Sequence, residues 1–374
     1  MVVDAHQGSI FNTKISKTRV EIPDFEIDVP ILLVDGQVDG PTAEFLRCID
    51  RSPVARRIDN FTEDMRASGS GHLDLKLKIP LDEAKIDEST VDGTYRFKNN
   101  EVTVDSALPP IRQVNGSLQF SGSDLRVPEI TGTLFGGPLT IKGGLQKDGR
   151  VLITADGSIN VEQLRKETPS PWLTHLSGVT PYKREVRINK RNADLVVDTE
   201  LIGLESRLPE PFTKSTQDPL PLRFEKKILA VTEKGKSAKS IREGLPARDQ
   251  ISLTLGKQLS AQIIRRRQDD GFALERGAVA LGRPLQLPES GLSLAVSNKR
   301  LDIDVWRQVL RNDGKATKTD GGNPPDFFPN TVQLRTGELI LFGRRLNDVD
   351  LAAQARRQQW RMRLASRQAS GELA

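Results

Sequence analysis

The sequence has few of the residues that build disulfides, metal sites and bulky cores. It contains 1 cysteine and 3 histidines among 374 residues, which excludes a disulfide within the chain and a cysteine-rich metal site. The histidines His6, His72 and His175 are far apart, and none has a partner at metal-ligand spacing. With only 3 tryptophans, 2 tyrosines and 13 phenylalanines, the core is expected to consist of leucine, isoleucine and valine. We therefore predict neither a metal ion nor a cofactor.

Long apolar runs are also missing. No stretch approaches the roughly 18–20 consecutive apolar residues of a membrane helix. The first residues do not show the basic segment followed by an apolar core that marks an export signal. Two interpretations remain open: a cytoplasmic protein, or a fragment whose targeting segment lies upstream in a longer chain.

Motifs for catalysis and for nucleic-acid binding are absent as well. The chain has no G-x-S-x-G, H-E-x-x-H or P-loop motif, and the Gly-Ser-Gly at 69–71 continues into a strand pattern and is expected to be a turn. The arginine triplet at 265–267 is interpreted as a solvated strand end, and the acidic pair at 269–270 as part of a hairpin turn. The net charge of +5 is only mildly basic, and aromatic residues are not interleaved with the basic ones. We predict a protein that is not an enzyme and does not bind nucleic acid.

Alternation of apolar and polar residues is the strongest pattern that is present. From Leu73 to Leu81, every second residue is leucine or isoleucine, which is typical of a half-buried strand. The alternation recurs at 251–255, 292–296, 301–305 and 360–364. Asp-Gly and Asn-Gly dipeptides between such runs supply the positive φ angles of tight hairpins. We therefore predict a mostly β fold of antiparallel strands, with one apolar face and one wet face.

Helices and domain boundaries leave weaker signals. Short helices are predicted at 41–49, with a continuation to 58 after Pro53, at 161–166 and at 304–311. A chain of this length suggests two domains or one extended architecture. The best linker is the stretch 166–172, which contains two prolines. We expect one β segment over 1–168, with a helix near 41–58, and a second over 169–374.

The apolar stripes allow two interpretations. They could form an ordinary core between two packed sheets, or they could line a long groove that holds acyl chains. A lipid needs a continuous apolar surface, worth roughly 0.8 kcal/mol per buried CH₂, and no catalytic group. On the groove interpretation, the lining residues are predicted from their phase in the alternation to be Leu73, Leu75, Leu77, Ile79, Leu253, Leu255, Leu292, Leu294 and Val296.

Several segments resemble the YhdP-like proteins of the AsmA-like family. The sequence LIGLESRLPEPF at 201–212, followed by Lys214 and by LPL at 220–222, resembles their "GL-x-S-x-LP-x-P…K…LPL" segment. LDIDVW at 301–306 is similar to their "LDLDAW" turn from strand to helix, and SRQASGEL at 366–373 is similar to their "S-x-Q-x-x-GE-L" strand end. The segments 135–141 and 193–197 fit the same group.

This resemblance implies a fold and a function. Members of the family are anchored in the inner membrane by an N-terminal helix, cross the periplasm, and move phospholipid toward the outer membrane. Their long, twisted and curled antiparallel sheet, of the repeating β-groove type, encloses an apolar groove. By resemblance, the segment 169–374 continues the sheet of 1–168. This chain lacks the anchor, and we expect an interior or C-proximal fragment of a periplasmic, inner-membrane-anchored protein in the cell envelope.

Two functions from different classes follow. The first is a monomeric, non-catalytic bridge segment that shields phospholipid acyl chains between the inner and outer membranes, which it reaches through other parts of a longer chain. The second is a structural or interaction scaffold of the cell envelope that carries no lipid.

Overall fold

The structure is a computed structural model. It describes the whole chain except residues 7, 11, 53–54, 56–61, 105–108, 123, 148, 168–169, 190–191, 230–247, 269–270, 312–328, 357–358 and 374. The protein is mostly β, with 22 strands in an open, mixed sheet that is not closed into a barrel. The chain divides into two compact units: unit 1 comprises Met1–Ser158 and Lys183–Ala193, and unit 2 comprises Ile159–Tyr182 and Asp194–Ala374. The expectation that 1–168 and 169–374 form two groove segments stays a prediction.

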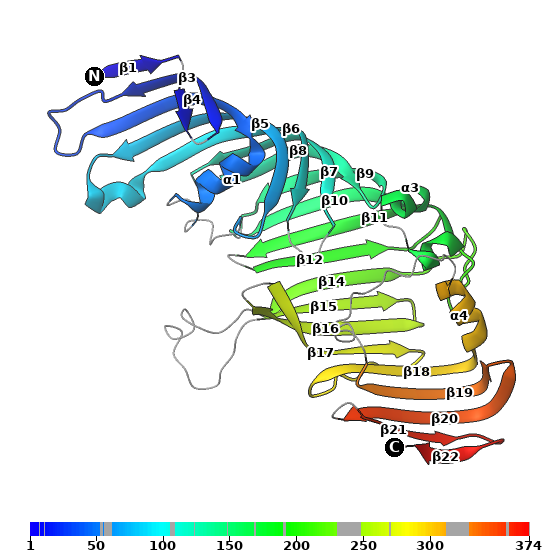
Figure 1. Cartoon of the computed structure of the whole chain (residues 1–374). Helices are drawn as coiled ribbons and strands as arrows, with labels where there is room; N and C mark the ends of the chain where they lie inside the picture. Colours follow the sequence, from blue (N-terminus) through cyan, green and yellow to red (C-terminus); the bar gives the residue numbers. More distant parts are fainter. Residues whose placement is uncertain are drawn as a thin grey trace. The chain divides into compact units, whose positions relative to one another are not determined.

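Unit 1 is a run of antiparallel neighbours (Figure 1). Strands β1 and β2 both pair with β3, and each strand from β3 to β9 then pairs with the next one along the chain. The strands are β1 (Val2–Ala5), β2 (Gly8–Ile10), β3 (Thr13–Glu21), β4 (Ile31–Pro41), β5 (Arg66–Pro80), β6 (Thr90–Thr103), β7 (Ile111–Ser121), β8 (Asp124–Leu134), β9 (Gly137–Leu145) and β10 (Val151–Asn160).

Within the described residues of unit 1, helix α1 and the 3₁₀ helix η1 interrupt this run of strands. Helix α1 (Thr42–Asp50) follows β4 directly, with Pro41 as its extended N-cap residue. Proline is tolerated there because a helix start has no partner for its first N–H groups. The 3₁₀ helix η1 (Glu83–Glu88) lies between β5 and β6, and Asp82 caps it by accepting a hydrogen bond from the Ala84 N–H. The continuation of α1 that the sequence predicts after Pro53 lies largely outside the described residues.

The remaining elements lie in unit 2, except that residues 183–189 of β11 and 192–193 of β12 belong to unit 1. Strand β11 pairs with β13, and the series β12–β14–β15–β16–β17–β18–β19–β20–β21–β22 forms by neighbour pairing. The elements are α3 (Val161–Glu167), η2 (Pro171–His175), β11 (Leu176–Asn189), β12 (Asn192–Thr199), β13 (Leu204–Ser206), β14 (Leu222–Leu229), β15 (Arg248–Leu255), β16 (Leu259–Gln268), β17 (Gly271–Leu281), β18 (Gly291–Asp302), α4 (Ile303–Arg311), β19 (Thr331–Leu341), β20 (Arg344–Arg356), β21 (Gln359–Ala365) and β22 (Ser370–Leu373).

The predicted mostly antiparallel β fold is confirmed, with one local departure. Strand β18 runs parallel to both of its neighbours, β17 and β19. Parallel neighbours need a crossover connection. Residues 282–290 connect β17 to β18 and contact β18, because the Ser293 hydroxyl donates to the Gln286 carbonyl. Helix α4 lies in the connection from β18 to β19. Alternation reports which face a residue occupies and carries no information on strand direction.

The helices predicted at 161–166 and 304–311 are confirmed as α3 and α4. The alternation at 301–305 predicts a strand, and this prediction is wrong after Asp302, where β18 ends and α4 begins. The Asp302 carboxylate accepts a hydrogen bond from the Val305 N–H at 3.1 Å, which caps the first turn of α4. This cap favours the helical conformation of Ile303 and Val305, although their apolar spacing is typical of a strand.

Candidate functional site

The predicted lining residues of β5 lie on one face of unit 1. Directly paired residues of neighbouring strands share a face, so register extends the alternation of one strand into rows across several. One row contains Val34, Leu77 and Val91, and a second contains Val38, Leu73, Tyr95 and Leu118. Leu75 lies between them, and Ile79 pairs with Leu32. We call this surface the apolar face of unit 1; its members are Leu32, Val34, Val38, Leu73, Leu75, Leu77, Ile79, Val91, Tyr95 and Leu118.

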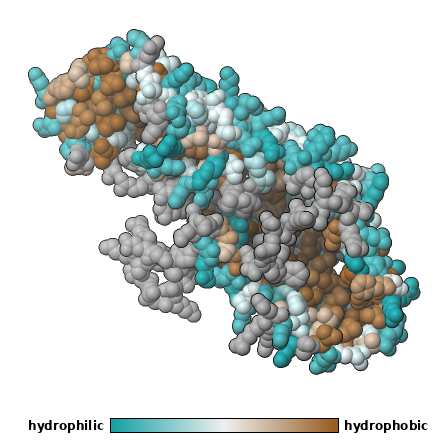
Figure 2. All heavy atoms as spheres, viewed as in Figure 1, coloured by the Kyte–Doolittle hydropathy of each residue, from teal (hydrophilic) through white to brown (hydrophobic). Residues whose placement is uncertain are grey.

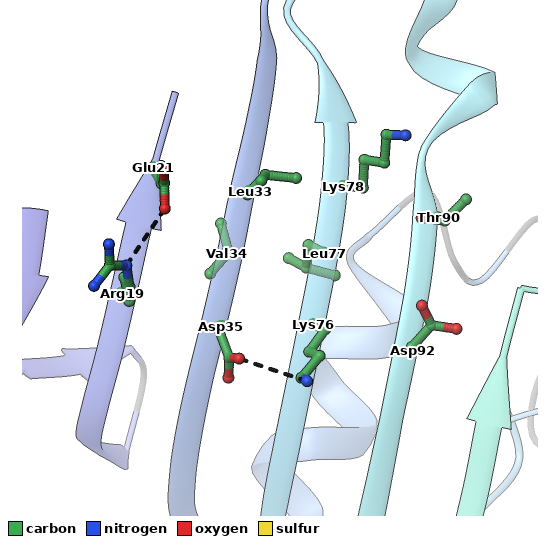
Figure 3. A pocket seen from close by; sticks show the side chains of 10 residues that line it. All are labelled: Arg19, Glu21, Leu33, Val34, Asp35, Lys76, Leu77, Lys78, Thr90 and Asp92. Atoms are coloured by element: carbon green, nitrogen blue, oxygen red, sulfur yellow. Dashed lines mark hydrogen bonds and ion pairs between the residues drawn. The ribbon is translucent and has the colours of Figure 1, made fainter. Parts of the chain in front are cut away.

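The opposite face of unit 1 is charged. Asp35 pairs with Lys76 across β4 and β5 at 3.7 Å, and Arg19 pairs with Glu21 on β3 at 3.4 Å (Figure 3). A shallow, open depression of about 450 Å³ lies here, and charged side chains of β3 to β6 dominate its lining. These ion pairs are exposed, so they contribute little to stability and keep this face compatible with water.

Helix α1 covers part of the apolar face of unit 1. The rings of Phe45 and Tyr95 meet edge to face, with centroids 5.0 Å apart. The Thr42 hydroxyl lies 2.8 Å from the Tyr95 hydroxyl and donates to the Asn100 side-chain carbonyl. Burial raises the pKa of Tyr95 to about 12, so this phenol stays neutral. Gly71 makes the arrangement possible, because a Cβ there would lie 2.1 Å from the Tyr95 hydroxyl oxygen.

The predicted lining residues of unit 2 are also brought together by register. Leu253 and Leu294 lie in one row, Leu255 and Val296 in the next, and Leu292 in a third beside them. We call this surface the apolar face of unit 2. Its three rows are Phe224, Leu253, Ala261, Val279, Leu294, Val332, Ala353, Met362 and Leu373; Leu222, Leu255, Leu259, Leu281, Val296, Leu334, Leu351 and Leu364; and Ile251, Ile263, Gly277 and Leu292.

The predicted lining residues differ in burial. Leu292 and Val296 are buried, at 9% and 8% exposure, whereas the other seven predicted lining residues are half-buried. A second packed layer would bury leucines at such positions more completely. Figure 2 shows hydrophobic side chains open to view over the N-terminal strands of unit 1 and, separately, over the C-terminal strands of unit 2. Each unit therefore presents apolar side chains that remain partly accessible.

One charged cluster on the apolar face of unit 2 escaped sequence reasoning. The sequence predicted a solvated strand end at 265–267, and this is wrong for Arg265. Its guanidinium binds the Asp249 carboxylate through Nε at 2.9 Å and through Nη2. The Lys226 ammonium lies 3.8 Å from the same carboxylate. The position of these residues in the alternation could have revealed the cluster. Arg265 follows Ile263 by two residues and Asp249 precedes Ile251 by two, so each lies on the apolar side of its strand.

Two of the segments that resemble the YhdP-like family meet in unit 2. The ring of Phe212 contacts the ring of Trp306 on α4 edge to face, with centroids 5.7 Å apart. Lys214 is buried, at 6% exposure, and its ammonium donates to the carbonyls of Leu204 at 2.8 Å and of Ser215 at 2.7 Å. These residues are structural: they close the loop between β13 and β14 and pack it on the helix.

His72 lies on the charged face of unit 1, between two carboxylates. Its Nδ1 is 2.8 Å from Asp39 and its Nε2 is 3.3 Å from Asp74. The hydrogen bond from the His72 ring to the Asp39 carboxylate, and secondarily that to the Asp74 carboxylate, raises the pKa of His72 above its ordinary value of 6.5. Because the folded pKa is raised, the stabilisation is complete below about pH 6.5 and is lost as pH rises through the folded pKa.

We expect an NMR titration to give a His72 pKa above 6.5, and Asp39→Asn to lower it toward 6.5. The matched control Asp35→Asn, on the same strand and face but without contact to His72, should leave the pKa of His72 unchanged. The stability change should stay below about 1 kcal/mol, since the pair is near the surface. A pKa at or below 6.5 in the unsubstituted protein would contradict this expectation.

In the part of the chain that the structure describes, no three or more histidine, cysteine, aspartate and glutamate side chains come together as a metal site. No helix among the same residues combines the length and the hydropathy that a membrane crossing requires.

Fold and surface together define a class: an open β-sheet protein in which unit 1 has a charged face and each unit has a partly accessible apolar face. The YhdP protein family matches residues 1–374, and the chain belongs to this family. Among curated proteins, the intermembrane phospholipid transporter YhdP of Escherichia coli (strain K12) is 24% identical over 212 residues. That alignment covers 55% of this chain and 16% of the relative's length. No solved structure matches the chain.

Proposed function

We propose that this chain is a segment of a non-catalytic phospholipid transporter, in which acyl chains lie on the apolar faces of the sheet. The observation that carries this proposal is the continuity of the rows in unit 2, where Leu253 and Leu294 belong to one apolar line that extends across strands β14 to β22. The half-buried state of these leucines supports it, because a cargo surface must be accessible.

The mechanism is passive shielding. Each acyl methylene that leaves water for the apolar face gains about 0.8 kcal/mol. A row of similar leucine, valine and alanine side chains offers nearly equal positions along the sheet, so a chain can shift from one to the next with little change in free energy. No proton or group transfer is needed, which is why we propose no catalytic residue.

The proposed route and location are supported by kinship. The relative's name describes an intermembrane phospholipid transporter. We propose by analogy that this chain works in the periplasm as a monomeric part of a longer inner-membrane-anchored protein and that the cargo passes between the inner and outer membranes. The apolar faces serve as the bridge surface, and the charged faces remain toward water.

Native mass spectrometry of the purified chain tests the cargo. We expect phospholipid to co-purify with it and to appear as adducts with phospholipid masses. A chain that carries no phospholipid, even after incubation with phospholipid vesicles, would contradict the proposal and favour the scaffold function.

A further inference from the structure

Helix α1 is an element of unit 1 that the proposed function does not use, although it lies on the surface where that function places acyl chains. Its first turn is tightly packed, because Thr42 is 3% exposed and Phe45 is 8% exposed. The Phe45 ring meets the ring of Tyr95, which is 7% exposed, with centroids 5.0 Å apart. The part of the apolar face of unit 1 under Phe45 is therefore covered by protein.

Register places α1 at one end of the strands that form this face. Pro41, directly before α1, pairs with Ser70 near the start of β5, whereas Ile31 pairs with Pro80 at the end of β5 (Figure 1). At that second end the alternation of apolar residues continues to Leu81, which is 48% exposed. The apolar face of unit 1 thus has one end covered by a helix and one end where an apolar side chain meets water.

Polar groups at the covered end make it unsuitable for hydrocarbon. The Thr42 hydroxyl lies 2.8 Å from the Tyr95 hydroxyl and donates to the Asn100 side-chain carbonyl. An acyl chain that displaced α1 would take Thr42 away and leave the Tyr95 hydroxyl and the Asn100 side chain against hydrocarbon. This exchange is unfavourable, because polar groups that leave water need hydrogen-bond partners. Helix α1 is therefore a fixed wall at this end of the face.

The stripe between the two ends has the length of an acyl chain. From Leu73 to Ile79, β5 advances six residues, about 20 Å. An acyl chain in one leaflet spans about 15 Å, half of the bilayer's hydrocarbon core. Leu75 and Leu77, between the ends of this stripe, are half-buried and so partly accessible. A chain that enters at the open end can therefore lie along β5 and reach α1 with its last methylenes.

We propose that α1 is the wall against which acyl chains end in unit 1. A phospholipid binds there with the ends of its acyl chains at Phe45 and its head group beyond Ile79, at the open end. This inference rests on the proposed function. It adds a direction for the lipid along the strands, and it makes Phe45 a positioning residue that limits how far an acyl chain extends.

The test uses two phosphatidylcholine probes that differ only in the place of a photoreactive diazirine. One probe carries it at the end of an acyl chain, and the other carries it in the head group. Each probe is presented to the full chain in phosphatidylcholine vesicles, and after irradiation peptide mass spectrometry locates the labelled residues. We expect the acyl-end probe to label Leu73 and Phe45, and the head-group probe to label Leu32 and Leu81.

A substitution in the wall tests the role of Phe45. In Phe45→Ala the acyl-end labels are expected to shift past Tyr95 to Phe97, whose ring lies 4.9 Å from the Tyr95 ring, while the head-group labels stay in place. The matched control is Arg47→Ala on the same helix, where the side chain is 48% exposed, and both label maps should stay unchanged. Thermal unfolding shows whether Phe45→Ala folds; if it does not, the maps of the unsubstituted protein decide the direction of the lipid.

Four outcomes would overturn the inference. Labels from both probes at the same residues, or with the two ends exchanged, remove the direction and leave the proposed function standing. Labels confined to unit 2 do the same. Acyl-end labels that stay in place in a folded Phe45→Ala protein remove the positioning role of Phe45. If neither probe labels the apolar face of either unit, the proposed function fails, and this inference fails with it.

Discussion

Aspartate at both Leu253 and Leu294 is expected to reduce bound phospholipid at least about tenfold. The two leucines belong to the same row of the apolar face of unit 2, separated by Ala261 and Val279. A carboxylate on this surface keeps its water, and the acyl methylenes opposite it lose their apolar contact. Loss of two methylene contacts at about 0.8 kcal/mol each already exceeds the 1.4 kcal/mol of a tenfold change. The measurement is the amount of phospholipid that co-purifies with the chain.

The control for this prediction places the same charge on the opposite face. Thr254 on β15 and Gln333 on β19 are exposed on that face, and Thr254→Asp with Gln333→Asp should leave the bound phospholipid unchanged. Unfolding midpoints of both double variants show whether the fold survives. A folded Leu253→Asp, Leu294→Asp protein with its full complement of lipid would contradict the role of this row.

Replacement of Asn100 by leucine is expected to destabilise unit 1 by about 3 kcal/mol. Asn100 is 1% exposed, donates to the Ser70 carbonyl at 2.7 Å and accepts from the Thr42 hydroxyl. Leucine removes one partner of the buried Thr42 hydroxyl, which also lies at the Tyr95 hydroxyl, and the side-chain donor to the Ser70 carbonyl. A buried polar group that loses its partner costs about 1–3 kcal/mol. In a unit of this size the thermal midpoint should fall by about 6–12 °C.

Lys98→Ala provides the comparison for Asn100→Leu. Lys98 is exposed on the same strand, and its substitution should change stability by less than about 0.5 kcal/mol. Calorimetry of both variants is the measurement. Equal midpoints for Asn100→Leu and the unsubstituted protein would show that this network does not hold α1 on the sheet.

The lining residues could be predicted from alternation because a strand turns successive side chains to opposite faces. That rule assigned Leu73, Leu75 and Leu77 to one face of β5, and register agrees. Whether the residues line a groove that holds lipid stays a prediction. The rows themselves were beyond sequence reasoning, since Leu253 meets Ala261 and Phe224 only through a register that alternation does not specify. Alternation also does not give the direction of a strand, and the sequence therefore did not predict that β18 is parallel to its neighbours.

The charged cluster was missed for a different reason. Arg265, Arg266 and Arg267 are alike as residue types, and a basic triplet beside a turn is usually solvated. Their environments differ because consecutive residues face opposite sides: Arg265 binds buried Asp249, whereas Arg266 binds Glu275 on the exposed face. Asp249 lies 16 residues away in sequence and becomes a partner only through the pairing of β15 with β16. The contact between Phe212 and Trp306 could not be predicted either, because the two residues are far apart in the sequence and meet only in the fold.

The central claim, that the apolar faces carry lipid, is tested most directly by placing a photoreactive residue at each position of 251–255 and 292–296 in turn. After irradiation in phospholipid vesicles, crosslinks should form at Ile251, Leu253, Leu255, Leu292, Leu294 and Val296. The positions between them, Ser252, Thr254, Ser293 and Ala295, should give none, because they lie on the other face. Crosslinking with this period of two is the predicted result. Crosslinks at all positions alike, or at none, would contradict it.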